Sequence, residues 1–292
     1  MPSQLLLNAI YAGTLYGLVA ISFGLIQSTT RIFHIAHAVV YTGAAYLTLT
    51  FVEFLHLPLP VGILAAIAGA TALGLAMELC IYRPVRQRRC HPFVSLLCSL
   101  GLFVALQNTI SLLFGDATRT LHQTGGSGII EIASARLTNI QAAGIVVSTL
   151  LAFGLWVWLR YFRAGRMIRA VANSSELSAV VGVNNESVFG VTFVVSSALV
   201  SVAGIVSAFD TDLTPSMGFK ALLLGVVASV VGGSGSVPGA FVGGLVVGLV
   251  QHLSSWKLPT HWQDTFVFVV LVAFLVIRPQ GLMGTQKNPT NQ

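Results

Sequence analysis

Long apolar segments without charged residues alternate with short polar segments along the chain. The charge-free windows are 1–30, 32–52, 54–77, 90–115, 137–159, 187–209 and 221–256. A helix of about 20 mostly apolar residues crosses a hydrocarbon core about 30 Å thick. The pattern therefore predicts one membrane helix in each of the first six windows and two elements in the last.

A shorter apolar stretch, Phe266–Ile277, adds a last element, which begins near Leu258 if Asp264 lies at the membrane surface. We therefore expect an all-α polytopic membrane protein of eight or nine transmembrane or re-entrant helices, in a single transmembrane domain over residues 1–292. Segment 218–238 is expected to be either a re-entrant hairpin or a full crossing. The windows are too long and too uniformly apolar for barrel strands, which alternate in polarity over about 10 residues.

The composition indicates the same class of protein. Hydrophobic residues make up 55% of the chain and charged residues 8%, against about 25% charged residues in a typical soluble domain. A soluble chain needs more polar residues at its surface, and a disordered chain is poor in apolar ones. The run Leu5–Ile26 is too long for a signal peptide and has no basic residue before it, so we expect it to remain as the first helix.

Basic residues gather in two polar segments, and this predicts the orientation. The two clusters are Arg83, Arg86, Arg88 and Arg89, and Arg160, Arg163, Arg166 and Arg169. Because short cytoplasmic loops concentrate Lys and Arg, we expect an outer N-terminus, a cytoplasmic C-terminus, an outer loop at 115–138 and a cytoplasmic loop at 160–186. The net charge of +6 is then a consequence of topology. The basic residues are divided among separate turns and do not form one basic face, which argues against a nucleic-acid partner.

The glycine-rich segment Gly232–Pro238 interrupts the last long apolar window. It lacks the Lys that a nucleotide-binding P-loop requires. A broken helix at membrane depth is buried in protein or lines a cavity, and such breaks often mark a transporter's substrate path. An intramembrane serine hydrolase that uses His252 or His261 is disfavoured, because no orienting group for a Ser–His pair is evident.

Metal and cofactor sites are not expected. His34 and His37 are three residues apart and could share a metal ion on one helical face, but a third ligand is not evident, so we interpret them as polar residues at the cytoplasmic end of the second span. The three cysteines have no metal-ligand spacing. Cys80 and Cys98 lie in apolar segments, where we expect buried, inert thiols.

Residues 164–182 carry a recognisable pattern. The stretch Ala164-Gly165-Arg166-Met167-Ile168-Arg169-Ala170-Val171-Ala172 is followed by Glu176-Leu177-Ser178-Ala179-Val180-Val181-Gly182. It resembles the cytoplasmic coupling loop of ABC-importer permeases, the E-A-A-x-x-x-G element. Its form is most similar to the branched-chain amino acid permease family, which also includes urea and short-chain amide transporters. Glu176 and Gly182 keep the spacing, and Leu177 and Ser178 replace the two alanines.

Three further segments extend the resemblance over nearly the whole chain. Ile32–Ala38 with Tyr41 is similar to the family's I-N-F-A-H-G-x-x-Y stretch, with Ala36, His37 and Tyr41 matching and His34, Ala38 and Val39 departing. Gly232–Gly248 resembles the signature before the last spans, although Gln251 stands where Glu is common. Arg278-Pro279-Gln280-Gly281-Leu282 resembles the R-P-x-G-L ending. The departures at 34–39 bear on the substrate more than on the fold.

The resemblance implies a permease subunit of an ATP-driven importer for branched-chain or other neutral amino acids, or for related small amides. It implies a bacterial inner-membrane location, two cytoplasmic ABC ATPase subunits, a second permease subunit that is a copy or a paralogue, and a periplasmic or extracellular solute-binding protein. ATP hydrolysis would take place on the partner chains. This chain is then not an enzyme, holds no cofactor and works by alternating access.

Two groups of site residues follow from the resemblance. The expected ATPase-coupling residues are Gly165, Arg166, Arg169, Glu176 and Gly182. They lie in or beside a short amphipathic helix, capped by Ser174 or Ser175, with sharp turns at the two glycines. Arg166 and Arg169 either pair with acids on the ATPase or anchor at lipid head groups. The expected substrate path lies where the Gly232–Pro238 segment meets the first and second spans, and its residues are His37, Tyr41, Gly232, Gly233, Gly235, Pro238 and Gly239.

A stand-alone channel or secondary carrier for a small neutral solute is the alternative function. Ion-coupled carriers usually hold ionisable residues at mid-membrane depth. In this chain the acids Glu53, Glu78, Asp210 and Asp264 lie near the ends of the predicted spans. This pattern disfavours ion coupling, whereas an uncharged pore stays compatible with the sequence.

Overall fold

The computed structural model describes residues 2–88, 90–121, 128–132, 135–233, 235–256, 259–278 and 280–284. Its helices are α1 (Pro2–Thr30), α2 (His37–Leu49), α3 (Leu59–Met77), α4 (Arg83–Gln87), α5 (Pro92–Phe114), α6 (Asn139–Tyr161), α7 (Arg163–Asn173), α8 (Ser175–Val180), α9 (Asn185–Asp210), α10 (Met217–Gly232), α11 (Val237–Ser254) and α12 (Gln263–Ile277). π-Helical turns at Thr50–Phe54 and Glu78–Tyr82 prolong α2 and α3, and a 3-10 turn, Thr260–Trp262, precedes α12. Strands β1 (Ile129–Ile132) and β2 (Ala135–Thr138) pair antiparallel.

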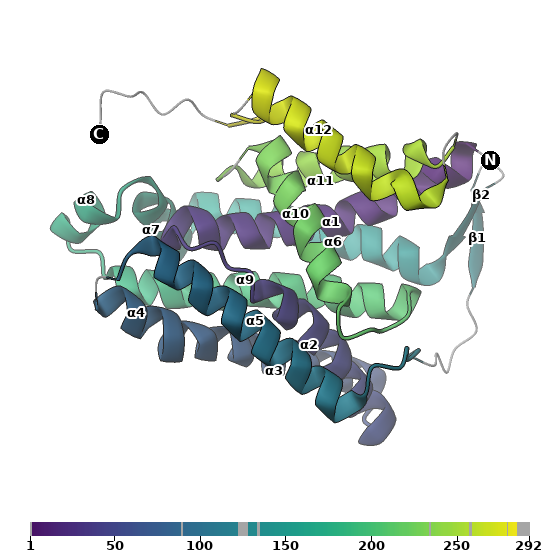
Figure 1. The fold of residues 1–292 in the computed structure, drawn as a ribbon, viewed down its shortest axis with the longest axis horizontal. Helices are drawn as coiled ribbons and strands as arrows, with labels where there is room; N and C mark the ends of the chain where they lie inside the picture. The colour runs from purple at the N-terminus through teal and green to yellow at the C-terminus, as the bar shows by residue number, and fades with distance from the viewer. Residues whose placement is uncertain are drawn as a thin grey trace.

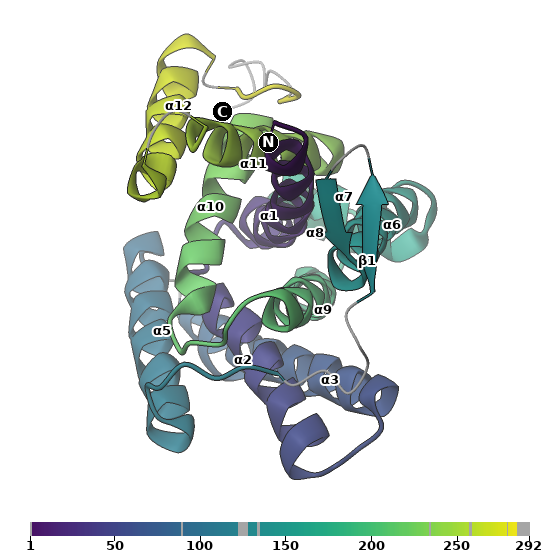
Figure 2. The ribbon, with the colours of Figure 1, turned by 90° about the vertical axis from the view of Figure 1, so that its right-hand side faces the viewer.

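The expected all-α membrane fold is confirmed. Six helical segments are long and apolar enough to cross a membrane: Ser3–Thr30, Leu59–Gln87, Pro92–Phe114, Asn139–Tyr161, Asn185–Asp210 and Val237–Ser254. Helices α10 and α12 are shorter apolar helices, and the 221–256 window contains α11 and most of α10, as expected. In Figures 1 and 2, α10 is steeply inclined to α1, α6 and α9. Its 16 residues are fewer than a straight crossing requires, which favours a partial crossing for this element.

Helix α1 lies at the centre of the bundle, with α6, α9, α10 and α11 around it (Figure 2). Glycines allow the closest of these contacts. A side chain at Gly244 of α11 would place its Cβ 2.7 Å from the carbonyl oxygen of Gly13 and closer still to Gly17. Small residues four positions apart let membrane helices approach at the backbone. The spaced glycines of α1 and α11 therefore form one antiparallel seam.

The two ends of the bundle carry different elements. The β-hairpin and the N-terminus lie at one end, and α7, α8 and the turn between α10 and α11 lie at the other (Figure 1). The Gln4 side chain donates a 2.9 Å hydrogen bond to the carbonyl oxygen of Arg136, which joins α1 to β2. The predicted outer and cytoplasmic loops are thus at opposite ends.

The expectation of buried thiols is wrong for Cys80 and Cys98. Cys80 and Cys90 are exposed, and Cys98 is partly exposed. Helix α5, which carries Cys98, buries few of its residues against the bundle. Apolar sequence alone does not distinguish a membrane helix's outer face from its inner face, since both are apolar.

Candidate functional site

The sequence predicts one short amphipathic helix in the 160–186 loop, whereas the structure has two, α7 and α8, of which α7 is strongly amphipathic. Gly165, Ile168 and Val171 form its buried face, and Arg166 and Arg169 are exposed. The buried residues recur every three positions, so they share one side of the helix. This side packs against the end of α6 and against α1 and α9.

Gly165 does not form a turn, which corrects one expectation. The chain reverses at Phe162, which has an extended conformation between α6 and α7, whereas Gly165 is inside α7. A Cβ on Gly165 would lie 2.5 Å from the carbonyl oxygen of Trp158 and would overlap the backbone of Leu159. The glycine is therefore needed for the close approach of α7 to α6.

Gly182 forms the expected sharp turn. Its φ of +85° is in the left-handed region, where glycine is the favoured residue. The Val183 N–H donates to the Ser178 carbonyl at 2.9 Å, and the Gly182 N–H donates to the Ala179 carbonyl at 3.0 Å. These two bonds form a Schellman motif that ends α8. The predicted cap at the start of α8 is also confirmed, because the Ser174 hydroxyl accepts a 3.3 Å hydrogen bond from the Leu177 N–H.

Three apolar side chains of the α8 segment point away from the bundle. We call Leu177, Val180 and Val181 the α8 knob; their exposed fractions are 68%, 84% and 78%. Figure 1 shows α8 at the outermost edge of this end of the molecule. Adjacent exposed apolar side chains on a helix at the edge of the molecule indicate a surface that contacts another molecule.

An ion-pair cluster anchors the start of α9, which follows the α8 knob in the chain. The Arg86 guanidinium contacts the Glu78 carboxylate and donates to Glu186 Oε2 at 2.9 Å, while it stacks over the Phe189 ring at 4.3 Å. Arg83 lies 3.5 Å from the same Glu186 oxygen. The cluster fixes the start of α9 to the end of α3 and α4. The sequence indicates only a topological role for these arginines, because Glu186 and Phe189 are about 100 positions from Arg86 in the chain.

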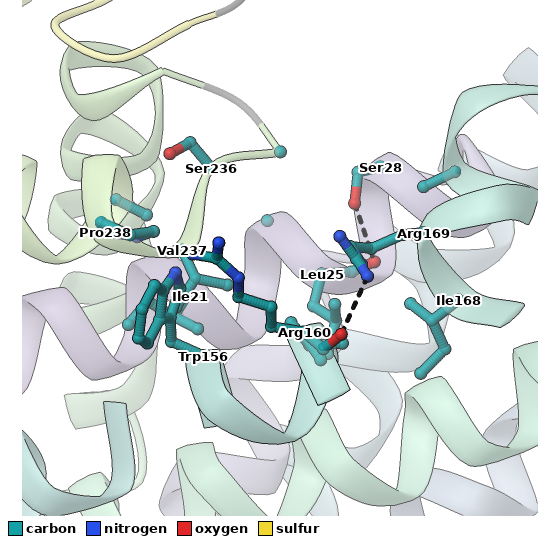
Figure 3. Close-up of a pocket in the computed structure, with 15 residues that line it drawn as sticks. Ile21, Leu25, Ser28, Trp156, Arg160, Ile168, Arg169, Ser236, Val237 and Pro238 are labelled. Carbon is teal, nitrogen blue, oxygen red and sulfur yellow. Dashed lines mark hydrogen bonds between the residues drawn. The ribbon is translucent and has the colours of Figure 1, made fainter. Parts of the chain in front are cut away.

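A cavity of about 390 Å³ lies behind α7, among α1, α6 and the start of α11 (Figure 3). Its walls are Ile21, Gly24, Leu25, Ser28, Trp156, Leu159, Arg160, Ile168, Arg169, Ala172, Gly235, Ser236, Val237, Pro238 and Ala240. The cavity joins members of the two predicted groups: Arg169 from the coupling set, and Gly235 and Pro238 from the path set. Gly235 has a φ of +91° and Ser236 caps α11.

The other predicted path glycines are closely packed. A Cβ on Gly239 would overlap the carbonyl oxygen of Gly232, and one on Gly233 would lie 2.6 Å from the nitrogen of Gly284. The 280–284 segment is held there by a 3.0 Å hydrogen bond from the Met283 N–H to the Gly232 carbonyl. Ser234 and Pro279, which belong to the recognised motifs, lie outside the described residues.

His37 and Tyr41, both in α2, lie apart from the cavity and next to a different face of α1. His37 Nε2 is 3.0 Å from the Ser22 hydroxyl, whereas Ile21 and Leu25 face the cavity. The backbone of Tyr41 packs against Gly204 of α9. The Gly232–Pro238 segment thus meets one face of α1. His37 and Tyr41, the predicted path residues of the second span, lie next to another face of α1.

The two histidines of the Ile32–Ala38 stretch are fully buried. His34 Nδ1 is 2.7 Å from the Tyr82 hydroxyl, and the two imidazole centroids are 5.4 Å apart. A group of three or more His, Cys, Asp or Glu side chains able to hold a metal ion does not occur within the part of the chain that the structure describes.

The family model described as "Branched-chain amino acid transport system / permease component" matches residues 5–275. The chain belongs to this permease family. It is 32% identical to the high-affinity branched-chain amino acid transport system permease protein LivH of Escherichia coli (strain K12), with 96% of this chain and 95% of the relative covered. It is 28% identical to the permease protein BraD of Pseudomonas aeruginosa, at the same coverage.

A solved structure has the same fold at low sequence identity. This chain superposes on a chain of "PsaBC from Streptococcus pneumoniae in complex with Fab" with a TM-score of 0.54 and 11% identity. The superposition covers 94% of this chain and 91% of the other. This likeness concerns the fold alone. Together with the apolar helices, the family match identifies a multi-pass membrane permease.

Proposed function

We propose that the chain is the permease subunit of an ATP-driven importer for branched-chain amino acids, moved between inward- and outward-facing states by separate ATPase subunits. The family match and the LivH and BraD relatives support the substrate class. Two cytoplasmic ATPases, a second permease subunit and an external solute-binding protein complete the proposed assembly. The end that carries α7 and α8 faces the cytoplasm in this proposal.

The exposed α8 knob is the structural observation that best supports a contact with separate ATPase subunits. Leu177 and Val180 project from a short helix whose two ends are fixed by the Ser174 cap and the Gly182 turn. An apolar helix face of this kind fits a groove on a partner protein. Because α7 is packed on α6, and Arg86 ties the start of α9 to Glu78, a force on α8 would reach several membrane helices.

The remaining coupling residues have roles in the same proposal. Glu176 is in the first turn of α8, where a carboxylate is favoured by the helix dipole. Arg166 is exposed on α7 and is free to meet acidic groups of an ATPase. The proposed substrate path runs past His37 and Tyr41 beside α1, whereas Gly235 and Pro238 line the separate cavity at another face of that helix. Transport requires different affinities for the ligand in the two states.

Co-purification tests the proposal. The tagged chain is extracted from its native membrane in mild detergent, and bound proteins are identified by mass spectrometry with and without cross-linking. We expect two nucleotide-binding ATPases and a second permease. Uptake of radiolabelled leucine by reconstituted vesicles, driven by internal ATP, then tests the substrate class. Recovery of the chain alone after cross-linking would reject the importer and favour a stand-alone channel or carrier.

A further inference from the structure

The cavity behind α7 concentrates positive charge. The guanidinium groups of Arg160 and Arg169 both line it (Figure 3). A third, that of Arg31, donates a 3.0 Å hydrogen bond to the carbonyl oxygen of Ala172, which is also a lining residue. The described residues that line the cavity include no Asp or Glu. The cavity is therefore a positively charged site at one end of a membrane protein.

The two lining arginines have unused hydrogen-bond donors. Arg169 Nη2 donates to the carbonyl oxygen of Arg160 at 3.2 Å, and Arg160 stacks over Trp156 at 5.4 Å. Across the described ranges, neither arginine forms an ion pair with a carboxylate. A guanidinium carries five N–H donors in a planar fork that suits a phosphate or carboxylate. The charge and geometry of the cavity thus select an anion.

Apart from the two arginines, Ser28 and Ser236, the described lining residues are glycine or apolar. Ile21 and Leu25 of α1 and Val237 of α11 form its wall. Beyond Trp156, the outer face of α6 continues with Phe153 and Leu150, whose exposed fractions are 61% and 63%. The Phe153 and Trp156 rings are 5.9 Å apart. An occupant can therefore have an anionic head at the arginines and an apolar tail along α6.

We propose that this cavity binds the phosphate headgroup of an anionic phospholipid from the leaflet on the α7 side. Basic pockets between membrane helices bind such headgroups, and each Lys or Arg near an anionic surface contributes about 1 kcal/mol. Trp156 lies beside the arginines, as tryptophans do at the membrane–water interface. The site goes beyond the proposed transport function and rests on it only for the identity of the leaflet as cytoplasmic. Because α7 forms one wall, the bound lipid stabilises its position.

Native mass spectrometry of the purified full chain, with any subunits that co-purify, tests the proposal. Phosphatidylglycerol and phosphatidylcholine with identical acyl chains are titrated separately, and the melting temperature is measured in parallel. We expect phosphatidylglycerol to bind and to raise the melting temperature, and phosphatidylcholine to do neither. The double variant R160Q/R169Q should bind phosphatidylglycerol about thirtyfold more weakly, in line with the contribution of two arginines.

Two further variants separate the cavity from general charge effects. The double variant R88Q/R163Q removes the same charge from exposed positions that do not line the cavity, and should bind as the unchanged protein does. Ala172→Leu fills the cavity and keeps all arginines, and should weaken binding to a similar degree even if R160Q/R169Q folds poorly. Equal weakening in R88Q/R163Q, or unchanged binding in Ala172→Leu, would overturn the proposal.

The source of the anion is tested in the same experiment. Inorganic phosphate at equal concentration should not raise the melting temperature. A matching rise with inorganic phosphate would overturn the assignment to a lipid. Equally, loss of ATPase co-purification in R160Q/R169Q with unchanged lipid binding would assign the arginines to an acidic protein partner instead.

Discussion

Arg86 joins Glu186, 100 positions later in the chain, through a 2.9 Å charge-assisted hydrogen bond at the base of the α7–α8 segment. The same guanidinium contacts Glu78, whose side chain is 1% exposed. A buried carboxylate requires a cationic partner, because the cost of removing its hydration is large. The pair therefore connects the end of the third span to the start of α9.

Replacing Arg86 by Met should destabilise the protein strongly. The Glu78 carboxylate would remain buried without a cation, a change that costs about 3–5 kcal/mol. The melting temperature in detergent, followed by intrinsic fluorescence, measures the effect. Arg83→Met is the matched control: Arg83 is 47% exposed, and its pair with Glu186 should contribute at most about 1 kcal/mol. Equal losses in the two variants would contradict a special role for Arg86.

A leucine in place of Gly244 should prevent correct packing of α1 against α11. Its Cβ would meet the backbone of Gly13 and Gly17, which cannot move aside as a side chain can. Overpacking of this kind costs about 3 kcal/mol. We expect a lower melting temperature and a smaller monodisperse fraction on gel filtration. Gly154→Leu should leave both measurements nearly unchanged, because no other part of the described structure lies within 4 Å of the added Cβ.

An aspartate at Val180 should impair transport without unfolding the protein. Val180 is 84% exposed in the α8 knob, so its replacement leaves the core intact but puts a charge into the proposed ATPase contact. We expect leucine uptake to fall about tenfold, which corresponds to about 1.4 kcal/mol of lost interaction, together with weaker ATPase co-purification. Gln87→Glu adds the same charge at an exposed position on α4 and should transport normally. Normal uptake by Val180→Asp would remove the knob from the coupling surface.

Gly182→Ala should loosen the end of α8. Alanine at a φ of +85° costs about 1 kcal/mol. Among the described residues, no atom lies within 4 Å of the added Cβ to cause a clash. Hydrogen exchange of the Val183 amide, which is bonded to the Ser178 carbonyl, should become about fivefold faster. Gly182→Asn should show a smaller effect, because Asn tolerates this conformation. No difference among the three proteins would show that the turn is not strained.

Gly165 and Gly182 illustrate how far sequence reasoning reaches. The sequence predicts a sharp turn at each of them, at the two ends of one helix. Gly182 has the required positive φ, whereas Gly165 is helical and packed against α6. The two uses of glycine, a rare backbone conformation and a close approach, look identical in sequence. Only the position of the neighbouring helix distinguishes them.

The cavity illustrates the same limit. The sequence predicts topology or coupling roles for Arg160 and Arg169, and roles in the substrate path for Gly235 and Pro238. Figure 3 shows Arg160, Arg169 and Pro238 around one space, and Gly235 also lines it. These segments come together because the chain reverses at Phe162 and α7 packs against the end of α6. The spacing of residues along the sequence does not predict this packing.

The sequence by itself determined that the chain is a multi-helix membrane protein, where most of its helices lie, and to which family it belongs. Charge-free windows of membrane length and locally spaced motifs carry this information, because hydrophobic transfer and helix capping act over a few neighbouring residues. The tertiary structure alone decided which apolar faces are inside and that Arg86 joins Glu78 to the distant Glu186. It also decided that two arginines share a cavity whose described lining residues include no acid. These features depend on contacts between residues far apart in the chain, and their free energies appear only when the helices pack.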